Sequence, residues 1–173
     1  KPAGLLSVPG RGPGKQDCLS ARVQARYPEA LPVHRLDLGT SGLLVLARSP
    51  AMHRALNRLF ETRRVEKRYV ALVAGPMDAG ERVIDLPLIA DWPNRPRCIV
   101  SAELGKPSVT RWRLADPSER PPMHTGIATR VELEPVTGRT HQLRVHLQAI
   151  GHPILGDALY ATPEQQAQAP RLL

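Results

Sequence analysis

The stretch "VHRLDLGTSGLLVLA", residues 33–47, places three ionisable side chains and a Gly-Thr-Ser-Gly turn before an apolar run. The run "GLLVLA" (42–47) predicts a buried strand, because it is short, continuous and apolar. Asp37 enters the turn, where a carboxylate can face solvent. Three interpretations are open. They are a structural corner, in which Asp37 pairs with Arg35 or bonds amides of the turn, a set of metal ligands, or a carboxylate held for chemistry.

The charge balance is the most informative feature of the composition. The chain has 24 basic and 16 acidic residues, a net charge of +8, and 20 of the basic residues are Arg. Arginine matches phosphate geometry and stacks on bases, so this excess suits a polyanionic partner such as RNA. A GC-rich genome would also raise the Arg count, so charge alone does not decide. The six aromatic residues argue against a stacking platform of the RRM or OB type.

The length and the remaining composition indicate a globular protein. The 173 residues suit one domain, 1–173, and no run of eighteen apolar residues or signal-peptide core is present. Cys18 and Cys98 lie far apart with no metal-binding spacing, so reduced thiols in a cytoplasmic protein are expected. Because the chain begins at Lys1 without Met, we expect it to be part of something longer.

Periodicity predicts an α+β fold with a mixed, mostly antiparallel central sheet, not a regular βαβ alternation. Loops are expected at 91–97 and, as a long hairpin connection, at 115–126. Besides 42–47, the predicted strands are 67–75, 98–103, 108–115 and 126–135.

Helix signals occur at four places. Asp17 is a possible cap for a first helix that carries Leu19, Val23 and Tyr27 and stops at Pro28. Ser49 is predicted to cap a second helix with Pro50 at its first position, and Thr162 a fourth, with Gln165 completing a capping box. The second helix should bury one face and expose Arg54 and Arg58; its predicted core face comprises Met52, Ala55, Leu56, Leu59 and Phe60.

The stretch "TGRTHQLRVH" (137–146) predicts the third helix, beginning at Thr140. Its polar face would carry His141, Arg144 and Gln148, and its apolar edge would consist of Leu143, Leu147 and Ile150. An arginine here could be an exposed helix residue, or a cation that keeps a carboxylate ionised.

Metal and cofactor signals are weak. His141 and His146 are five residues apart, which converges two imidazoles on one ion in neither a helix nor a strand. No GxSxG elbow points to a Ser-His-Asp triad, although the residue types for one are present, and no glycine-rich phosphate loop follows a strand to hold a nucleotide cofactor.

Taken together, three stretches resemble the catalytic motifs of the RluA family of pseudouridine synthases, in order and spacing. Flanking stretches such as "KPAGLLSVPG" and "DLPLIADWPNRP" extend the resemblance over nearly the whole chain, except around 115–126. The three motifs are "VHRLDLGTSGLLVLA", "KRYVALV" and "TGRTHQLRVHLQAIGHPILGDALY".

The resemblance implies isomerisation of uridine within RNA and assigns the site residues. Asp37 matches the catalytic aspartate, Tyr69 the active-site tyrosine, and Arg144 the arginine that pairs with the aspartate. Arg35 matches the residue that fills the space of the flipped base. Arg139 and His141 are expected to contact RNA. Whether Asp37 bonds to C1′ or removes the C2′ proton stays open, as does a merely structural role for Tyr69.

The resemblance also implies the partners. RNA is the expected substrate, in a stem-loop of large-subunit rRNA, of the tRNA anticodon arm, or of both. No cofactor, metal or membrane is expected, and the protein should be a monomer. No S4-type RNA-binding domain is expected, and the resemblance implies that the family's catalytic domain continues beyond both ends of this chain. Two alternatives remain: an inactive RNA-binding homologue, and an RNA N-glycosidase or nuclease.

Overall fold

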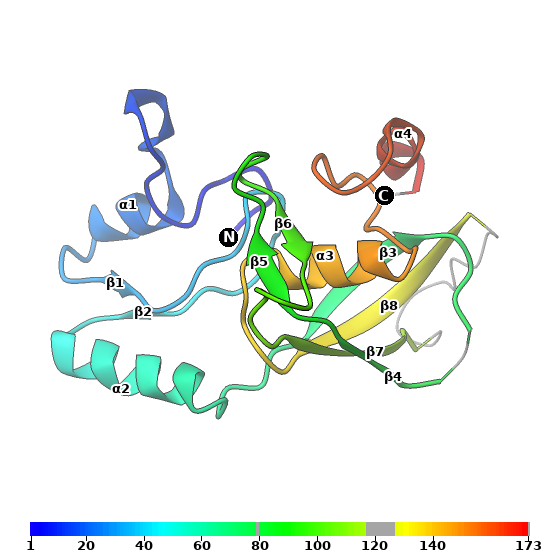
Figure 1. Ribbon diagram of the computed structural model, residues 1–173. Helices are drawn as coiled ribbons and strands as arrows, with labels where there is room; N and C mark the ends of the chain where they lie inside the picture. The colour runs from blue at the N-terminus through cyan, green and yellow to red at the C-terminus, as the bar shows by residue number, and fades with distance from the viewer. Residues whose placement is uncertain (79, 117–126, 173) are drawn as a thin grey trace. The chain divides into compact units, whose positions relative to one another are not determined.

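The longest strands form one antiparallel sheet in the second part of the chain. The computed structural model describes residues 1–78, 80–116 and 127–172, drawn in colour in Figure 1. They fall into two compact units, Lys1–Val65 and Glu66–Leu173.

The sheet of the second unit has the strand order β3-β8-β7-β4, and every pair in it is antiparallel. Successive side chains of a strand point to opposite faces of the sheet. Thr129, Val131 and Leu133 of β8 therefore share one face, and all three are buried. Helix α3 (Gln142–Ala149) covers this face through Leu147 (Figure 1). The strands are β3 (Tyr69–Ala74), β4 (Arg82–Asp85), β7 (Val109–Leu114) and β8 (Ala128–Pro135).

A short hairpin and a last helix complete the second unit. Strands β5 (Leu88–Ala90) and β6 (Cys98–Val100) pair antiparallel across a loop at 91–97. Helix α4 (Pro163–Leu172) begins with the predicted capping box: Thr162 Oγ1 accepts from the amide of Gln165, and Gln165 Oε1 accepts from that of Thr162. The predicted α+β class and antiparallel pairing are confirmed.

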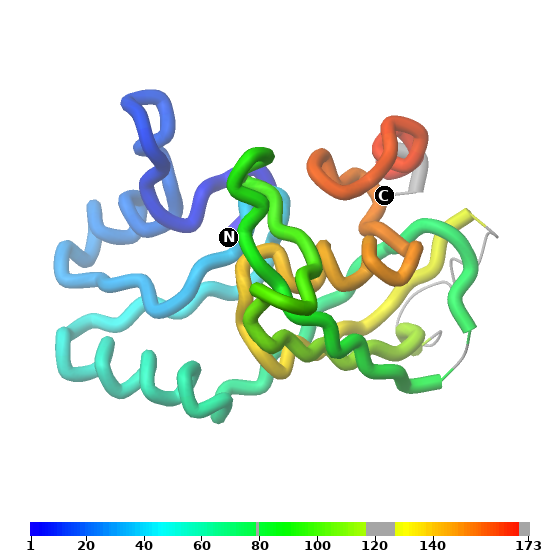
Figure 2. Tube along the Cα trace, viewed as in Figure 1, coloured from blue at the N-terminus to red at the C-terminus, as the bar shows by residue number. Residues whose placement is uncertain are grey.

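The first unit has little regular structure. It contains the 3₁₀ turn η1 (Pro13–Lys15), helices α1 (Leu19–Gln24) and α2 (Pro50–Glu61), and a two-stranded sheet. The sheet strands are β1 (Leu31–Pro32) and β2 (Leu46–Ala47). Between β1 and β2 the chain runs out and back as a long loop, residues 33–45, which Figure 2 traces.

The predicted buried strand at 42–47 is wrong, since only Leu46–Ala47 is a strand. Leu43 is 92% exposed. His34 Nε2 accepts a hydrogen bond from the amide of Val45 at 3.1 Å. This amide is therefore not available to pair with a neighbouring strand. Gly42 has a φ of 133°, which breaks the extended conformation.

Two predictions about helices are also wrong. Cys18, not Asp17, caps α1: its Sγ accepts from the amide of Ala21, while Asp17 forms an ion pair with Arg22. Helix α2 keeps its predicted Ser49 cap and its exposed arginines, but none of its residues is fully buried. The first unit has only two-residue strands against which α2 can pack, so its apolar face stays half-covered.

The remaining differences concern short strands. Strand β4 was not predicted, because its sequence "RVID" shows no alternation of apolar and polar residues; in the structure only its Ile84 is buried. Strand β6 stops at Val100, where Ser101 accepts main-chain and side-chain bonds from Gly105 and Leu104 that close a turn. Most of the predicted loop at 115–126 lies outside the described residues.

Candidate active site

The first candidate feature is Asp37 in the loop between β1 and β2. Its side chain is half-buried, between the exposed Arg35 and Leu38 and next to the buried Leu36. The amide of Thr40 donates to the main-chain carbonyl of Asp37 at 3.1 Å, which closes the predicted turn. The carboxylate therefore lies on an ordered turn and at the edge of solvent.

Residues 1–7 hold this turn from both sides of Asp37. Ser7 Oγ, buried, donates to the carbonyl of Leu36 at 2.6 Å and accepts its amide at 3.0 Å. On the other side, Lys1 Nζ and the amide of Gly4 donate to the carbonyl of Leu38 at 3.2 and 2.9 Å. The main-chain groups next to Asp37 are thus fixed by hydrogen bonds, and the loop needs no strand ladder to be ordered.

Lys1 also brings positive charge toward Asp37. Burial lowers the pKa of the Lys1 ammonium, and the negative charge of Asp37 acts in the opposite direction. Lys1 is thus within electrostatic range of the carboxylate, in the same unit. The sequence analysis did not single out Lys1, although "KPAG" was among the stretches that carried the family resemblance.

The second candidate feature is Arg144 on α3. Its Nε and Nη2 donate to Oδ2 and Oδ1 of Asp157 at 2.6 and 2.8 Å, a bidentate pair with both side chains largely buried. Asp157 Oδ1 also accepts from the amides of Leu159 and Tyr160 at 2.9 and 3.2 Å. A planar fork held at two points cannot rotate, so the direction of the Arg144 guanidinium is fixed.

The ionisation of Asp157 follows from these contacts. Burial alone would raise the pKa of its carboxyl, but the hydrogen bonds from Arg144 and from the main chain at Leu159 and Tyr160 outweigh burial and hold the pKa below its usual value. Asp157 is therefore a carboxylate at neutral pH and keeps the pair charged.

Tyr160 joins the helix to the β5–β6 hairpin. Its hydroxyl accepts from the amide of Cys98 at 2.8 Å and bonds to His141 Nδ1 at 2.7 Å, and its ring centre lies 5.0 Å from the Arg144 guanidinium. Burial raises the pKa of Tyr160 to about 12, so it stays protonated at neutral pH. Tyr160 therefore fixes His141 and packs beside Arg144.

A buried polar network holds the turn before α3. Gln142 Oε1 accepts from Thr137 Oγ1 at 2.7 Å and from the Arg139 amide at 3.0 Å, and its Nε2 donates to Thr110 Oγ1 and to the Val109 carbonyl. The predicted start of the helix at Thr140 is wrong. The helix begins at Gln142, and His141 precedes it with a left-handed φ of 55°. His141 therefore lies off the helix face on which it was predicted.

The predicted site residues fall into two groups. Asp37 and Arg35 belong to the first unit, whereas Tyr69, Arg139, His141 and Arg144 belong to the second. His141 and Arg144 meet at Tyr160, while Arg139 is exposed and its Nε donates to the carbonyl of Pro107 at 3.4 Å.

Tyr69 opens β3, half-buried against the core under α3. The pairing of Arg144 with Asp37 stays a prediction, because the two residues lie in different units.

Sequence reasoning missed Asp157 and Tyr160. Both lie in the quoted stretch "GHPILGDALY", where an aspartate among apolar residues signals a buried charge that needs a cationic partner.

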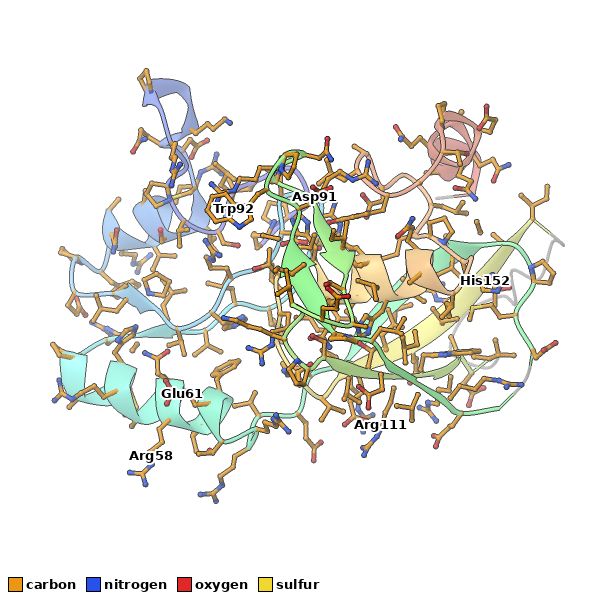
Figure 3. All side chains as sticks on the ribbon, in the orientation of Figure 1. Arg58, Glu61, Asp91, Trp92, Arg111 and His152 are labelled. Carbon is orange, nitrogen blue, oxygen red and sulfur yellow. The ribbon has the colours of Figure 1, made fainter. Side chains whose placement is uncertain are left out.

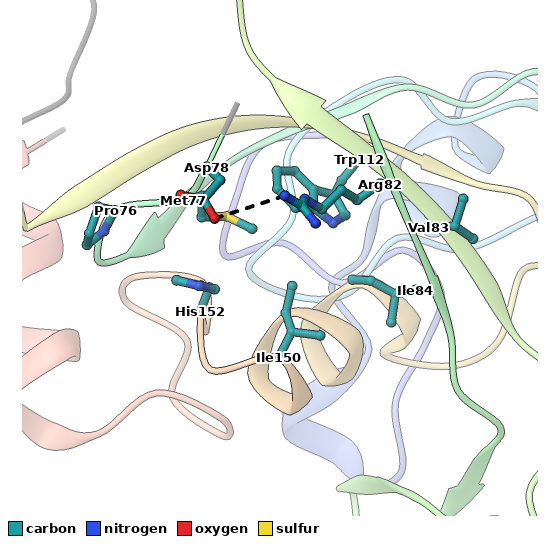
Figure 4. A pocket seen from close by; sticks show the side chains of 9 residues that line it. All are labelled: Pro76, Met77, Asp78, Arg82, Val83, Ile84, Trp112, Ile150 and His152. Atoms are coloured by element: carbon teal, nitrogen blue, oxygen red, sulfur yellow. Dashed lines mark ion pairs between the residues drawn. The ribbon is translucent and has the colours of Figure 1, made fainter. Parts of the chain in front are cut away.

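Two pockets in the second unit lie away from these side chains. One, of about 280 Å³, lies between Ile150, His152 and Trp112, with an Arg82–Asp78 ion pair at 4.0 Å on its rim (Figure 4). The other, of about 510 Å³, is lined by charged residues such as Arg111 and Glu134. Neither contains a predicted site residue.

Metal binding has no support in the described ranges. Within 1–78, 80–116 and 127–172, no three His, Cys, Asp or Glu side chains gather around a common point. Both ring nitrogens of the buried His146 are engaged, Nδ1 with Thr110 Oγ1 and Nε2 with the carbonyl of Leu86, each at 2.9 Å. No helix in the same ranges is long and apolar enough to span a bilayer.

Comparisons with known proteins match the whole chain. A sequence model of the family described as RNA pseudouridylate synthase matches residues 1–149. The dual-specificity RNA pseudouridine synthase RluA of Escherichia coli strain K12 is 50% identical over 173 residues, which is all of this chain and 76% of that protein. The enzyme of the same name from Yersinia pestis is 50% identical over 172 residues, 99% of this chain and 81% of the relative.

The solved structures that superpose on this chain are also RNA pseudouridylate synthase domains. Human RNA pseudouridylate synthase domain containing 1 superposes with a TM-score of 0.73 at 31% identity, over 88% of this chain and 64% of that one. Human RNA pseudouridylate synthase domain containing 4 superposes with a TM-score of 0.72 at 28% identity, over 94% of this chain and 64% of that one. This chain thus spans about three quarters of the Escherichia coli relative and less than two thirds of the solved chains. Fold and family agree with the resemblance found in the sequence, and the chain belongs to the RluA family of RNA pseudouridine synthases.

Proposed function

We propose that this protein isomerises uridine to pseudouridine in a stem-loop of large-subunit rRNA, of the tRNA anticodon arm, or of both. The observation that carries the proposal is identity of about 50% over the full chain to relatives named dual-specificity RNA pseudouridine synthases. In this reaction the N1–C1′ bond breaks, the base turns, and C5 bonds to C1′. Since no atom is gained or lost overall, the reaction requires no redox partner.

Asp37 is the proposed nucleophile. A carboxylate can add to an anomeric carbon as the bond to the base breaks, which leaves the uracil as an anion that must be retained. Return of the base through C5 then displaces the carboxylate, C5 loses its proton, and N1, now free of the sugar, gains one. The hydrogen-bonded loop supports this role, because it fixes the main chain on both sides of Asp37.

Arg144 is the proposed cation beside Asp37. A guanidinium has five N–H donors, and Asp157 engages its Nε–Nη2 edge, so a second carboxylate would approach the Nη1–Nη2 edge. The bidentate hold of Asp157 supports the proposal, because a cation fixed in direction stabilises a charge without reorganising.

The remaining predicted residues would serve RNA binding and base placement. Arg35, exposed on the Asp37 loop, would fill the gap left by the extruded uridine, since an arginine plane replaces a base well. Arg139 and His141 flank the start of α3 and would contact the RNA backbone. Tyr69 would stack on the flipped base.

The two units together would form one catalytic domain that acts as a monomer in the cytoplasm. The match of the family model to residues 1–149 supports the single catalytic domain, because it covers all of the first unit and most of the second.

The test is carbodiimide primer-extension mapping of rRNA and tRNA stem-loops before and after incubation with the protein. We expect a new stop at one uridine, with RNA length and mass unchanged, and no stop with Asp37→Asn. Binding without a stop would support the inactive homologue, and a free base or a cut strand would support a glycosidase or nuclease.

A further inference from the structure

We infer that Trp92 and Arg95, in the loop between β5 and β6, form a platform on which an unpaired base of the RNA stacks during the isomerisation. The inference rests on the proposed function, and it adds a substrate contact outside the three catalytic motifs. We call residues 91–97 the hairpin loop.

Trp92 is the exposed aromatic side chain of this chain. It is 67% exposed, whereas Trp112 and Tyr160 are 5% and 6% exposed and the other three aromatic residues are partly covered. Figure 3 labels it, beside Asp91, in the loop that joins β5 to β6. Leaving a large apolar ring in water gives up the stabilisation that burial would bring, so its position suits a partner that covers the ring.

Arg95 prepares this ring for a base. Its guanidinium carbon lies 3.0 Å from the centre of the Trp92 ring, so one face of the indole already carries a cation. Stacking on aromatic rings, reinforced by arginine, is how proteins hold single-stranded nucleic acid, because every base has a flat π-surface. The arginine also supplies positive charge for the adjoining phosphate.

The hairpin loop is ordered by its own main chain. The amide of Asp91 donates to the carbonyl of Arg97 at 2.9 Å, and the amides of Asn94 and Arg97 bond to the carbonyls of Asp91 and Asn94 at 3.1 Å each. Asn94 Nδ2 also donates to Asp91 Oδ2 at 3.0 Å. A closed loop of this kind presents Trp92 with little further loss of conformational entropy on binding.

The base of the hairpin is bonded to the candidate site. Cys98, the residue after the loop, donates its amide to the Tyr160 hydroxyl, which also bonds His141. Arg97 lies 5.4 Å from the centre of the same tyrosine ring. Tyr160 thus connects the base of the hairpin, at Arg97 and Cys98, to the side chains around Arg144.

Charge favours RNA over a protein as the occupant. The hairpin loop carries Arg95 and Arg97 against Asp91, and the chain as a whole has a net charge of +8. An exposed tryptophan beside arginines would also suit a protein interface, and the experiment below tests that alternative.

The experiment uses the fluorescence of Trp92 itself, because the only other tryptophan, Trp112, is buried. A synthetic stem-loop that the wild-type protein isomerises is added, and acrylamide quenching is measured for wild type and for Trp92→Phe. We expect RNA to shield the wild-type emission from acrylamide and to leave that of Trp92→Phe unchanged. Equal behaviour of the two proteins would overturn the inference.

Affinity provides the second measurement. Trp92→Ala should weaken RNA binding roughly tenfold, Trp92→Phe much less, and Leu104→Ala, at an exposed leucine in the turn after β6, not at all. Replacing loop nucleotides one at a time by abasic sites should reveal one position at which Trp92→Ala causes no further loss. If no position has this property, the base contact is excluded.

The outcomes separate this inference from the proposed function. If wild-type protein forms no pseudouridine in any RNA, the proposed function fails. If it forms pseudouridine while Trp92→Ala binds and reacts like wild type, the platform alone is wrong. Loss of a complex with a protein partner, with RNA binding intact, would assign Trp92 to a protein interface.

Discussion

Two regions present the two proposed catalytic charges, and they are ordered in different ways. The Asp37 loop, residues 33–45, is held mainly by hydrogen bonds to its main chain from residues 1–7. Arg144 stands on a helix packed on a sheet and is held by a buried carboxylate. The position of the Asp37 carboxylate therefore depends on a few hydrogen bonds within the first unit. The position of the Arg144 guanidinium is instead coupled to the packing, and hence the stability, of the second unit.

The largest loss of activity is expected from a substitution of Asp37 in the loop 33–45. Asp37→Asn keeps the shape and removes the charge, so single-turnover pseudouridine formation should fall by more than about 10³-fold. RNA binding and the melting temperature should stay close to wild type, because the side chain is only half-buried. Appreciable turnover by a pure preparation of this variant would remove Asp37 from the mechanism.

Unlike Asp37, Arg144 should contribute to the stability of the protein as well as to its activity. Arg144→Met leaves the largely buried Asp157 without its cation, so activity should fall about 10²-fold and the protein should lose about 3 kcal/mol of stability. Arg144→Lys should rescue only partly, since a point charge cannot bond both oxygens. Rates and denaturant curves measure both, and a near-normal rate in Arg144→Met would return Arg144 to a structural role.

Arg35 tests whether the loop also takes part in base flipping. If it fills the space of the extruded uridine, Arg35→Ala should lose about tenfold or more on a paired target and less on an unstacked one. The pH–rate profile should not move. Equal losses on matched structured and loosened RNAs, with a shifted acid limb, would mean that Arg35 only pairs with Asp37.

Ser7 tests the proposed local hold on the loop. Ser7→Ala leaves the buried amide and carbonyl of Leu36 without their partner, at a cost of about 1–3 kcal/mol. We expect a several-fold fall in the single-turnover rate at saturating RNA with little change in Kd. Ser101→Ala, which removes the bond from the Leu104 amide on a turn of the other unit, is the comparison for a general loss of stability. A fall in stability with an unchanged rate would show that Ser7 does not position Asp37.

The smallest effect concerns pH and only the second unit. Burial lowers the pKa of His146 from 6.5, so its stabilising contribution is complete above about pH 6.5 and is lost as the pH falls below that value. The lowered pKa of Asp157 acts in the same direction below its unfolded value of about 3.8. The free energy of unfolding measured with denaturant should fall between pH 7 and 5. His146→Gln should make this free energy less dependent on pH. If that variant does not fold, NMR titration of the wild-type protein should show a His146 pKa below the ordinary value of 6.5.

Patterns between near neighbours in the sequence were predicted well. The family motifs, the Ser49 cap, the Thr162–Gln165 capping box and the strand around Tyr69 all depend on groups a few residues apart, whose geometry the local backbone determines. These patterns were sufficient for the family, the α+β class and the choice of candidate residues.

The partners of those residues were decided by tertiary structure. Arg144 bonds to Asp157, thirteen residues away beyond a turn, and Tyr160 reaches back to Cys98, 62 residues earlier. Residues 42–45 of the predicted strand form a largely exposed loop, because Gly42 breaks the extended conformation and His34 accepts the amide of Val45. Sequence spacing cannot specify such contacts, since they form only when distant segments pack and when each buried polar group must find whichever partner the fold brings within reach.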